Sequence, residues 1–306
     1  MLRLLSPLLL WLAASSAAAA PDNPGFYRMK LGEFDVVALS DGSHPFPVDS
    51  VMVGSTPAAI AAALEREALR LPLQGSINAF LIDTGAQRIL VDTGAGTLYG
   101  DCCGRIPASL RAAGYRPEQI DLILLTHLHK DHVGGAMRAD AFPNARLIVA
   151  ANEAGYWRDP VKRRAAPDFL NSFFDSAADA LASWAAAGRL RTFTGEAGIA
   201  PGVRSVAAAG HTPGHAAYLV ESRGARLLVW GDIVHVAAVQ LEEPGVSVKY
   251  DSDGAGAERT RRTLLERAVR EKLWVAAAHL SFPGLGQFRR AQSGYRWIPA
   301  NYQTTP

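Results

Sequence analysis

The sequence predicts a layered α/β fold that forms a single domain. Short apolar runs bounded by Gly, Asp and Pro recur in two series, which is typical of buried β-strands. Segments with apolar residues at helical spacing accompany each series. No low-complexity stretch and no block of like charge separates the two halves, so we expect one domain over residues 21–306.

The expected strands fall into an N-terminal and a C-terminal series. The first series lies at residues 34–39, 77–82, 88–91, 122–125 and 147–150. The second series lies at residues 203–207, 217–220, 226–230 and 273–277. Sheets and helices each bury one apolar face, so two β-rich halves followed by helices predict sheets layered against helices.

Two segments have the pattern of amphipathic helices. Between the two series, apolar residues recur at steps of three or four and form one face, namely Phe169, Phe173, Ala177, Leu181 and Trp184. Near the C-terminus, residues 258–272 combine an apolar stripe with Glu and Arg pairs four positions apart, which stabilise an exposed helix face. We expect both helices to pack onto a sheet.

The composition is that of a folded protein and excludes several classes. Of the 306 residues, 49% are hydrophobic and 20% are charged, which is too rich in core-forming side chains for a disordered chain. The net charge of +2 gives no sign of a nucleic-acid partner. The two cysteines, Cys102 and Cys103, are too few for a disulfide scaffold, and because they are adjacent we expect free thiols.

Residues 1–20 have the order of a cleavable signal peptide. Arg3 precedes an apolar stretch over residues 4–14, and small residues end at Ala20. The strongly apolar part is about a dozen residues, shorter than the roughly 20 that an uncleaved membrane anchor needs. We therefore expect cleavage after Ala20, a periplasmic or secreted protein, and no membrane attachment of the mature chain.

A cluster of metal-binding side chains follows the strand expected at residues 122–125. The chain places His127, His129, Asp131 and His132 within one short turn. With eight histidines in 306 residues, three in such a turn are not expected by chance. Neutral imidazole and carboxylate groups are good ligands of zinc and similar divalent ions. The turn is therefore predicted to bind metal.

Three further donors lie beyond expected strands of the second series. His211, Asp232 and His279 each follow an apolar run, and His211 opens a turn rich in Gly and Pro. Open α/β sheets bind their ligands at the carboxyl ends of strands, so these side chains are expected at the same edge as the histidine-rich turn. Four donors in one turn and three elsewhere predict a site with more than one ion.

The combined pattern resembles the signature of the metallo-β-lactamase superfamily. It consists of His127-x-His129-x-Asp131-His132, His211, Asp232 and His279, preceded by Val91-Asp92-Thr93-Gly94. The resemblance covers essentially the whole mature chain and implies a four-layer αββα sandwich with two divalent metal ions, most consistent with zinc, at one edge. The donor types also suit manganese, iron or cobalt.

The same resemblance implies a role for each donor. One ion would be held by His127, His129 and His211, and the other by Asp131, His132 and His279. Asp232 would bridge the two ions. Asp92 would lie behind the ligands and bind no metal.

The expected chemistry is hydrolysis. Two ions about 3.5–4 Å apart lower the pKa of a bridging water toward about 7, which supplies hydroxide at neutral pH. One ion also polarises the oxygen of the electrophile, so no nucleophilic side chain is required. We expect Asp131 and Asp232 at the reaction centre, cleavage of an ester-like or phosphoester-like bond, and loss of activity in acid or with chelators.

Shorter motifs resemble the methyl parathion hydrolase branch of the superfamily, close to the quorum-quenching lactonases. They are Ser76-Ile77-Asn78-Ala79-Phe80-Leu81, His211-Thr212-Pro213-Gly214-His215, Ala237-Ala238-Val239-Gln240 and His279-Leu280-Ser281-Phe282-Pro283-Gly284. The resemblance implies an aromatic pocket for small, neutral, apolar lactones, aryl esters or phosphotriesters. It suggests Tyr99, Trp157, Phe173 and Phe174 as pocket residues, with core packing as an equal alternative for each.

His235 stands where acyl-homoserine lactonases of the superfamily have a tyrosine, three residues after the bridging aspartate. A phosphotriester with a nitrophenolate leaving group needs no proton donor, whereas the poorer leaving group of a lactone benefits from one. We therefore predict that His235 is catalytic and favours lactones or aryl esters, with a histidine of the pocket wall as the equal alternative.

Other activities on the same fold stay open at this point. A β-lactamase fits an exported chain, but the dizinc lactamases have cysteine or serine where this sequence has Asp232. A glyoxalase II-type thioesterase shares the ligands but acts on a glutathione thioester in the cytosol.

Three further classes fit less well. A nuclease would need a basic face or an RNA-handling segment. An iron-dependent redox protein would need a flavin domain, and a metal-binding module without activity would not need all seven donors. We expect a small-molecule substrate and no nucleic acid, and apolar surface near Trp157 is compatible with a homodimer.

Overall fold

Two seven-stranded β-sheets form the centre of the protein. A computed structural model describes residues 23–302, so the expected signal peptide at residues 1–20 lies outside the described residues. The first sheet has the strand order β1 (Phe26–Leu31), β2 (Phe34–Phe46), β4 (Leu73–Asp83), β5 (Arg88–Val91), β6 (Leu122–Leu124), β7 (Arg146–Ala150) and β8 (Leu190–Phe193). The second has the order β16 (Tyr295–Pro299), β15 (Leu285–Arg290), β14 (Trp274–Ala276), β12 (Ala225–Val229), β11 (Ala216–Ser222), β10 (Val203–Ala207) and β9 (Gly198–Ala200).

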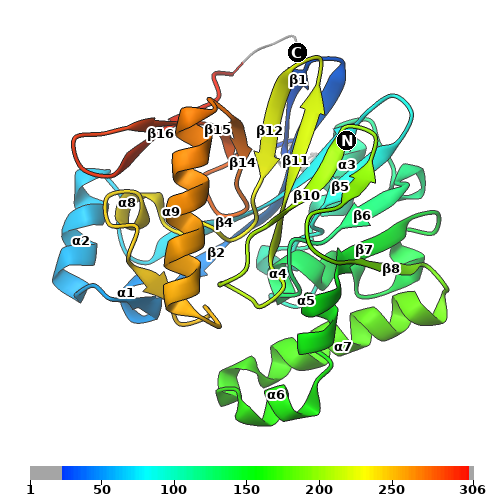
Figure 1. Cartoon of the computed structure of the whole chain (residues 1–306), viewed down its shortest axis with the longest axis horizontal. Helices are drawn as coiled ribbons and strands as arrows, with labels where there is room; N and C mark the ends of the chain where they lie inside the picture. Colours follow the sequence, from blue (N-terminus) through cyan, green and yellow to red (C-terminus); the bar gives the residue numbers. More distant parts are fainter. Residues whose placement is uncertain (1–22, 303–306) are drawn as a thin grey trace, which may run out of the picture.

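The helices lie outside the two large sheets. They are α1 (Val48–Val51), α2 (Pro57–Arg66), α3 (Ile106–Ala112), α4 (Lys130–Val133), α5 (Ala151–Tyr156), α6 (Pro160–Ala165), α7 (Asn171–Ala186), α8 (Ala237–Gln240) and α9 (Gly254–Arg270). A short two-stranded sheet, β3 (Met52–Val53) with β13 (Ser247–Val248), lies apart from the large sheets. In Figure 1, α9 lies on the side of the second sheet and α7 on the side of the first.

Three hydrophobic clusters fill the spaces between four layers. The first cluster lies between the outer face of the first sheet, with Leu90, and the helices α3 and α7. The second lies between the two sheets, where Ile89 and Val229 belong to one buried group. The third joins Leu228 of the second sheet to α9. Because neighbouring strand residues such as Ile89 and Leu90 point to opposite faces, each strand supplies two clusters, and the predicted αββα sandwich is confirmed.

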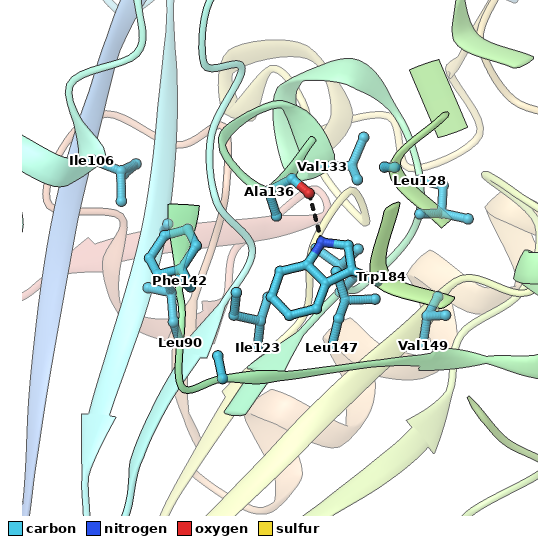
Figure 2. Close-up of a cluster of buried hydrophobic side chains, with 14 of the residues drawn as sticks. Leu90, Ile106, Ile123, Leu128, Val133, Ala136, Phe142, Leu147, Val149 and Trp184 are labelled. Carbon is cyan, nitrogen blue, oxygen red and sulfur yellow. Dashed lines mark hydrogen bonds between the residues drawn. The ribbon is translucent and has the colours of Figure 1, made fainter. Parts of the chain in front are cut away.

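Figure 2 shows how tightly the first cluster is packed. Trp184 of α7 lies over Ile123 and Leu147 of the first sheet and is fully buried. Its indole Nε1 donates a hydrogen bond of 2.7 Å to the carbonyl oxygen of Ala136. An indole N–H in an apolar layer needs such a partner, and this bond fixes the ring beside the segment that carries the histidine-rich turn.

Every predicted strand range overlaps a strand of the structure, and both predicted helices are present as α7 and α9. Among the described residues, the strands β1, β3, β8, β9, β13, β15 and β16 and the helices other than α7 and α9 were not predicted from the sequence. Five of these strands, β1, β8, β9, β15 and β16, lie at or next to the edges of the two large sheets. The strands β15 and β16 leave charged side chains exposed, so their apolar signal is weak. Within residues 23–302, no helix has the length and hydropathy to cross a membrane.

The parallel strands bring the predicted metal-binding residues to one edge. In the first sheet β5, β6 and β7 run parallel, and in the second sheet β12 runs parallel to β14. The carboxyl ends of parallel strands lie at the same edge of a sheet, which is where α/β proteins bind ligands. The turn after β6 and the turns after β12 and β14 therefore meet where the two sheets face each other.

Candidate metal centre

Asp92, which follows β5, fixes the histidine-rich turn through hydrogen bonds on the side away from the cavity. Asp92 Oδ1 accepts a hydrogen bond of 2.8 Å from the backbone N of Thr126. Its Oδ2 accepts from Thr126 Oγ1 at 2.8 Å and from His132 Nδ1 at 2.9 Å. The Thr126 hydroxyl oxygen in turn lies 3.1 Å from His127 Nδ1. Since Nδ1 of both histidines is engaged, their Nε2 atoms are the ones that point into the site.

The three donors from the second half of the chain are oriented in the same way. His211 Nδ1 donates to Asp251 Oδ1 at 2.7 Å, and His279 Nδ1 donates to the carbonyl oxygen of Ser76 at 3.0 Å. The backbone N of Asp232 donates to His215 Nε2 at 3.0 Å. Each contact fixes the tautomer or the backbone of one donor, so the side chains have little freedom to turn away.

The structure brings all seven predicted donors together. They form two groups whose candidate ligand atoms lie within 4.8 Å of one another, namely His127, His129, His211 and Asp232, and Asp131, His132 and His279. These groups match the two sets that the resemblance implies. The assignment of each side chain to one ion stays a prediction.

Asp232 lies between the two groups. Its Oδ2 is 3.2 Å from His211 Nε2 and 3.6 Å from His127 Nε2. Its Oδ1 is 3.0 Å from His132 Nε2 and 3.1 Å from His279 Nε2. One carboxylate therefore presents a different oxygen to each group, which is the arrangement that a bridging ligand requires.

Buried atoms without partners show that the residues fit a divalent cation. Among the described residues, His127 Nε2, His132 Nε2 and Asp232 Oδ1 are buried and have no partner in hydrogen-bonding geometry. A buried polar atom without a partner costs free energy, and these three point at the same place. A divalent cation accepts electron pairs from imidazole nitrogen and carboxylate oxygen, so it would satisfy all three atoms.

The pKa shifts also indicate a site for positive charge. Burial opposes the charged form of His132, but the carboxylates of Asp232, Asp92 and Asp131 outweigh it and raise its pKa well above the usual value. Burial opposes the charged form of His211 as well, yet hydrogen bonds to Asp232 and Asp251 raise its pKa to about 9.

Two other histidines of the site are neutral. Burial lowers the pKa of His127 and of His129 well below the usual value, and neighbouring histidines lower it further. Burial by itself would raise the pKa of Asp232, but the surrounding histidines hold it well below the usual value. A neutral imidazole and an ionised carboxylate are the forms that bind metal.

A cavity of about 890 Å³ opens onto the donors. Two of the predicted pocket residues, Tyr99 and Phe173, line it, together with His44, Phe46, Phe169 and Tyr250. The Tyr99 hydroxyl lies 3.5 Å from Asp131 Oδ1. Burial and the neighbouring Asp131 carboxylate raise the pKa of Tyr99 well above its usual value, so the phenol is neutral and can donate a hydrogen bond.

Trp157 and Phe174 do not line this cavity but lie in the hydrophobic core, the alternative that the sequence left open for each. Trp157 is 2% exposed, and its indole Nε1 donates to Glu153 Oε1 at 2.6 Å. Phe174 is 2% exposed and packs against the ring of Trp157. Successive residues of a helix face in different directions, so Phe173 reaches the cavity while Phe174 enters the core. The homodimer stays a prediction.

His235 lies on the cavity wall beside the donors. Its Nε2 is 3.1 Å from Asp232 Oδ2, and its ring is stacked on that of His279 with centroids 5.2 Å apart. Its Nδ1 is buried and has no hydrogen-bond partner among the described residues. The position is compatible with both readings of His235, a proton donor or a wall residue, and its catalytic role stays a prediction.

Several residues near the site were not identified from the sequence. Asp251 orients His211, and His44 and Phe46 reach the cavity because β2 extends beyond the predicted end of the strand. A count of all eight histidines was the one signal that could have pointed to His44. Asp251 has no distinctive spacing. Cys102 and Cys103 are free thiols as expected, and Cys102 lines the cavity.

Comparisons with known proteins agree with this geometry. The sequence profile described as "Metallo-beta-lactamase superfamily" matches residues 73–279. The crystal structure of the hydrolase AbOPH, described as belonging to the beta lactamase superfamily, is 33% identical and has a TM-score of 0.86 over 91% of this chain and 98% of that chain. AidC, described as a dizinc quorum-quenching lactonase in complex with a product, N-hexanoyl-L-homoserine, is 26% identical with a TM-score of 0.85 over 92% of this chain and 99% of that chain.

A curated relative carries a related description. An N-acyl homoserine lactonase of Bacillus cereus is 27% identical over 177 residues, which is 57% of this chain. The match spans 62% of the length of that lactonase. The profile match covers well over half of the chain and the site has the donors of such an enzyme, so the chain belongs to the metallo-β-lactamase superfamily and is a metal-dependent hydrolase.

Proposed function

We propose that this protein is a hydrolase with two metal ions that cleaves lactones and aryl esters. The observation that carries the proposal is the position of Asp232, whose two carboxylate oxygens face two separate groups of donors. A mononuclear enzyme needs only one such group. The similarity to a dizinc lactonase over 92% of this chain supports the same conclusion.

The residues of the chain have distinct tasks in this proposal. His127, His129 and His211 would hold one divalent ion and Asp131, His132 and His279 the other, with Asp232 shared. When bound, such ions supply Lewis acidity, which polarises a carbonyl oxygen and makes water a nucleophile at neutral pH. We propose zinc because imidazole and carboxylate donors suit it. The side chains that orient these donors would keep the nitrogen lone pairs directed at the ions.

The cavity supports a neutral substrate with an apolar part. The rings of Phe46, Phe173 and Tyr250 line it, and the acidic side chains on its wall, Asp131 and Asp232, are proposed metal ligands. The neutral Tyr99 hydroxyl would donate a hydrogen bond to a substrate oxygen near Asp131. An acyl-homoserine lactone or an aryl lactone combines an electrophilic carbonyl with an apolar group of this kind. The descriptions of AidC and of the Bacillus cereus relative as lactonases support this substrate class.

A neutral phosphotriester is the second candidate. The cavity volume of about 890 Å³ leaves room for an aryl group beside a tetrahedral phosphorus centre. The aromatic wall formed by Phe46, Tyr99 and Phe173 favours an aryl leaving group. We expect this activity to be weaker than the lactonase activity, in keeping with the prediction for His235.

A panel of substrates tests the proposal. Purified zinc-loaded protein is assayed with an aryl lactone, an acyl-homoserine lactone, methyl parathion, nitrocefin and lactoylglutathione. We expect the highest kcat/KM with a lactone and loss of activity when a chelator removes the metal. Hydrolysis of nitrocefin alone would contradict the proposal in favour of a β-lactamase, and hydrolysis of lactoylglutathione alone would favour a thioesterase.

We further propose that the protein is exported. The support is the order of charge, apolar stretch and small residues over positions 1–20. Expression of the full chain in a bacterial host followed by N-terminal sequencing of the periplasmic fraction tests the proposal. A mature protein that begins at Pro21 is the expected result, and an intact N-terminus in the cytosol would contradict it.

A further inference from the structure

Glu153 joins the two loops that carry the metal-binding histidines. It lies on α5 and is fully buried, and no sequence motif points to it. Its Oε1 accepts hydrogen bonds from the backbone N of Leu128 at 2.9 Å and from Trp157 Nε1 at 2.6 Å. Its Oε2 accepts from Thr212 Oγ1 at 2.7 Å and from the backbone N of Gly214 at 2.9 Å. One carboxylate therefore contacts both loops at once.

The donors to this carboxylate are direct chain neighbours of metal-binding residues. Leu128 lies between His127 and His129, and its side chain points into the hydrophobic cluster of Figure 2. Thr212 directly follows His211. Rings on the two loops approach closely, since His129 Nδ1 lies 3.0 Å from His211 Nε2. Whatever fixes the separation of the loops also fixes the separation of these two nitrogens.

The backbones of the two segments are in contact beside this carboxylate. A Cβ atom built on Gly214 would lie 2.1 Å from the backbone N of Glu153 and 2.6 Å from its Cα. Real Cβ atoms do not approach other heavy atoms so closely, so a side chain at position 214 would push the loop away from α5. The approach that lets Gly214 donate to the carboxylate therefore depends on glycine.

The four hydrogen bonds compensate for burying a carboxylate without a cation. Among the described residues, Glu153 forms no ion pair, so its charge is stabilised by dipoles alone. Three of its four partners are N–H groups, which can only donate hydrogen bonds. The ionised carboxylate, which can only accept them, is therefore the form of Glu153 that fits this site. Burial raises the pKa of Glu153, and each of the four hydrogen bonds acts in the opposite direction. Such charge-assisted bonds are the stronger ones in proteins.

We propose that Glu153 is a positioning residue that sets the distance between the loop of His127 and His129 and the loop of His211, and thereby the metal affinity of the site. The inference rests on the proposed function in one respect, namely that these histidines bind a divalent ion. It does not depend on which substrate the enzyme cleaves.

Four variants of the full chain test this role. Glu153→Gln keeps the size of the side chain but replaces two acceptor positions with an NH₂ group that faces donors. Thr212→Val removes one donor to the carboxylate, and Thr212→Ser keeps the hydroxyl and is its matched control. Trp184→Phe removes the hydrogen bond to the Ala136 carbonyl in the hydrophobic cluster and serves as a control for lost stability.

The readout is zinc affinity, measured for each variant by competition with a chromophoric chelator, together with the Tm. We expect Glu153→Gln to weaken zinc binding about 10–100-fold, the usual effect of losing a group that orients metal ligands. Thr212→Val should weaken it by a smaller factor, and Thr212→Ser should behave as wild type. Trp184→Phe should lower the Tm without changing zinc affinity. With cobalt(II) in place of zinc, the visible spectrum of Glu153→Gln should differ from that of the wild type.

Two results would overturn the inference. One is wild-type zinc affinity in Glu153→Gln or in Thr212→Val. The other is a loss of zinc affinity in Trp184→Phe that equals the loss in Thr212→Val. If Glu153→Gln does not fold, the Thr212 pair decides. A wild-type protein that binds zinc but leaves all lactones intact would count against the proposed substrate and not against the role of Glu153.

Discussion

The metal-centre edge and the hydrophobic cluster around Trp184 are both buried, but different interactions stabilise them. At the edge, directional hydrogen bonds join particular polar atoms, as between His132 Nδ1 and Asp92 Oδ2 or between His211 Nδ1 and Asp251 Oδ1. In the cluster, Leu147 and Ile123 contact many neighbours through dispersion and the removal of apolar surface from water (Figure 2).

This difference predicts how each region responds to change. A hydrogen bond or a metal contact depends on the position of one atom, so a small chemical change at the edge removes a specific function. Apolar packing depends on volume and shape, so a change in the cluster lowers the free energy of unfolding and leaves the chemistry of the folded molecules intact. Five substitutions in four experiments test this comparison, taken from the largest expected effect to the smallest.

Asp232→Ala should abolish most of the activity with little effect on folding. It removes both carboxylate oxygens that face the two donor groups. Metal ions acting as Lewis acids lower the activation barrier by several kcal/mol, and this effect would be lost with the ions. We expect kcat to fall on the order of 1,000-fold, which is about 4 kcal/mol. Metal content by mass spectrometry should fall from two ions per chain. A variant that retains two ions and wild-type kcat would remove the basis for a shared carboxylate.

Leu147→Ala should lower stability by about 2–5 kcal/mol and leave the edge unaffected. Leu147 is fully buried in the first cluster, so the substitution creates a cavity beneath Trp184. Urea unfolding measures the change, and kcat per folded molecule and zinc affinity should match the wild type. A fall in zinc affinity comparable to that of Glu153→Gln would mean that the two regions are not independent.

His235→Leu should change the preference between substrates. If His235 protonates a leaving alkoxide, its removal lowers kcat/KM for an aryl lactone about 100-fold, the usual contribution of a general acid. The kcat/KM for a phosphotriester with a nitrophenolate leaving group should stay near the wild-type value. An unchanged ratio of the two kcat/KM values would reduce His235 to a residue of the cavity wall.

Phe173 and Phe174 offer the finest comparison, because adjacent residues of α7 face the two regions. Phe173→Ala removes a ring from the cavity wall, and we expect KM for a lactone to rise about tenfold, or 1.4 kcal/mol of lost apolar contact. Phe174→Leu should lower the free energy of unfolding by about 1–2 kcal/mol without changing KM. A change of KM in Phe174→Leu but not in Phe173→Ala would contradict the placement of Phe173 in the cavity wall and of Phe174 in the core.

Much of the fold could be predicted from the sequence because it depends on local patterns. The strand β5 coincides with the predicted strand, since a run of Ile, Leu and Val before turn residues leaves few alternatives. The edge strand β16 and its neighbour β15 were missed because exposed Arg side chains hide the apolar pattern. The pattern of Phe169, Phe173 and Trp184 predicts α7, although it does not show which ring reaches the cavity.

The metal-binding residues could be predicted individually, but their supports could not. His127, His211 and His279 stand out because each follows an apolar strand. A metal-binding histidine just after a strand can be recognised from the sequence alone. Asp251 and Glu153 have no such signal. Each is an ordinary acidic residue whose role depends on partners in other loops, 25 to 61 positions away along the chain.

The sequence by itself determined the layered fold, the single domain, and the donors that can bind metal, because hydrophobic period and side-chain chemistry are local properties. The tertiary structure alone decided which oxygens of Asp232 face which histidines, which aromatic rings line the cavity, and that Glu153 holds two loops together. These features depend on distances between residues far apart in the chain. Such distances arise only when the two sheets pack together and bring the ends of their strands to one edge.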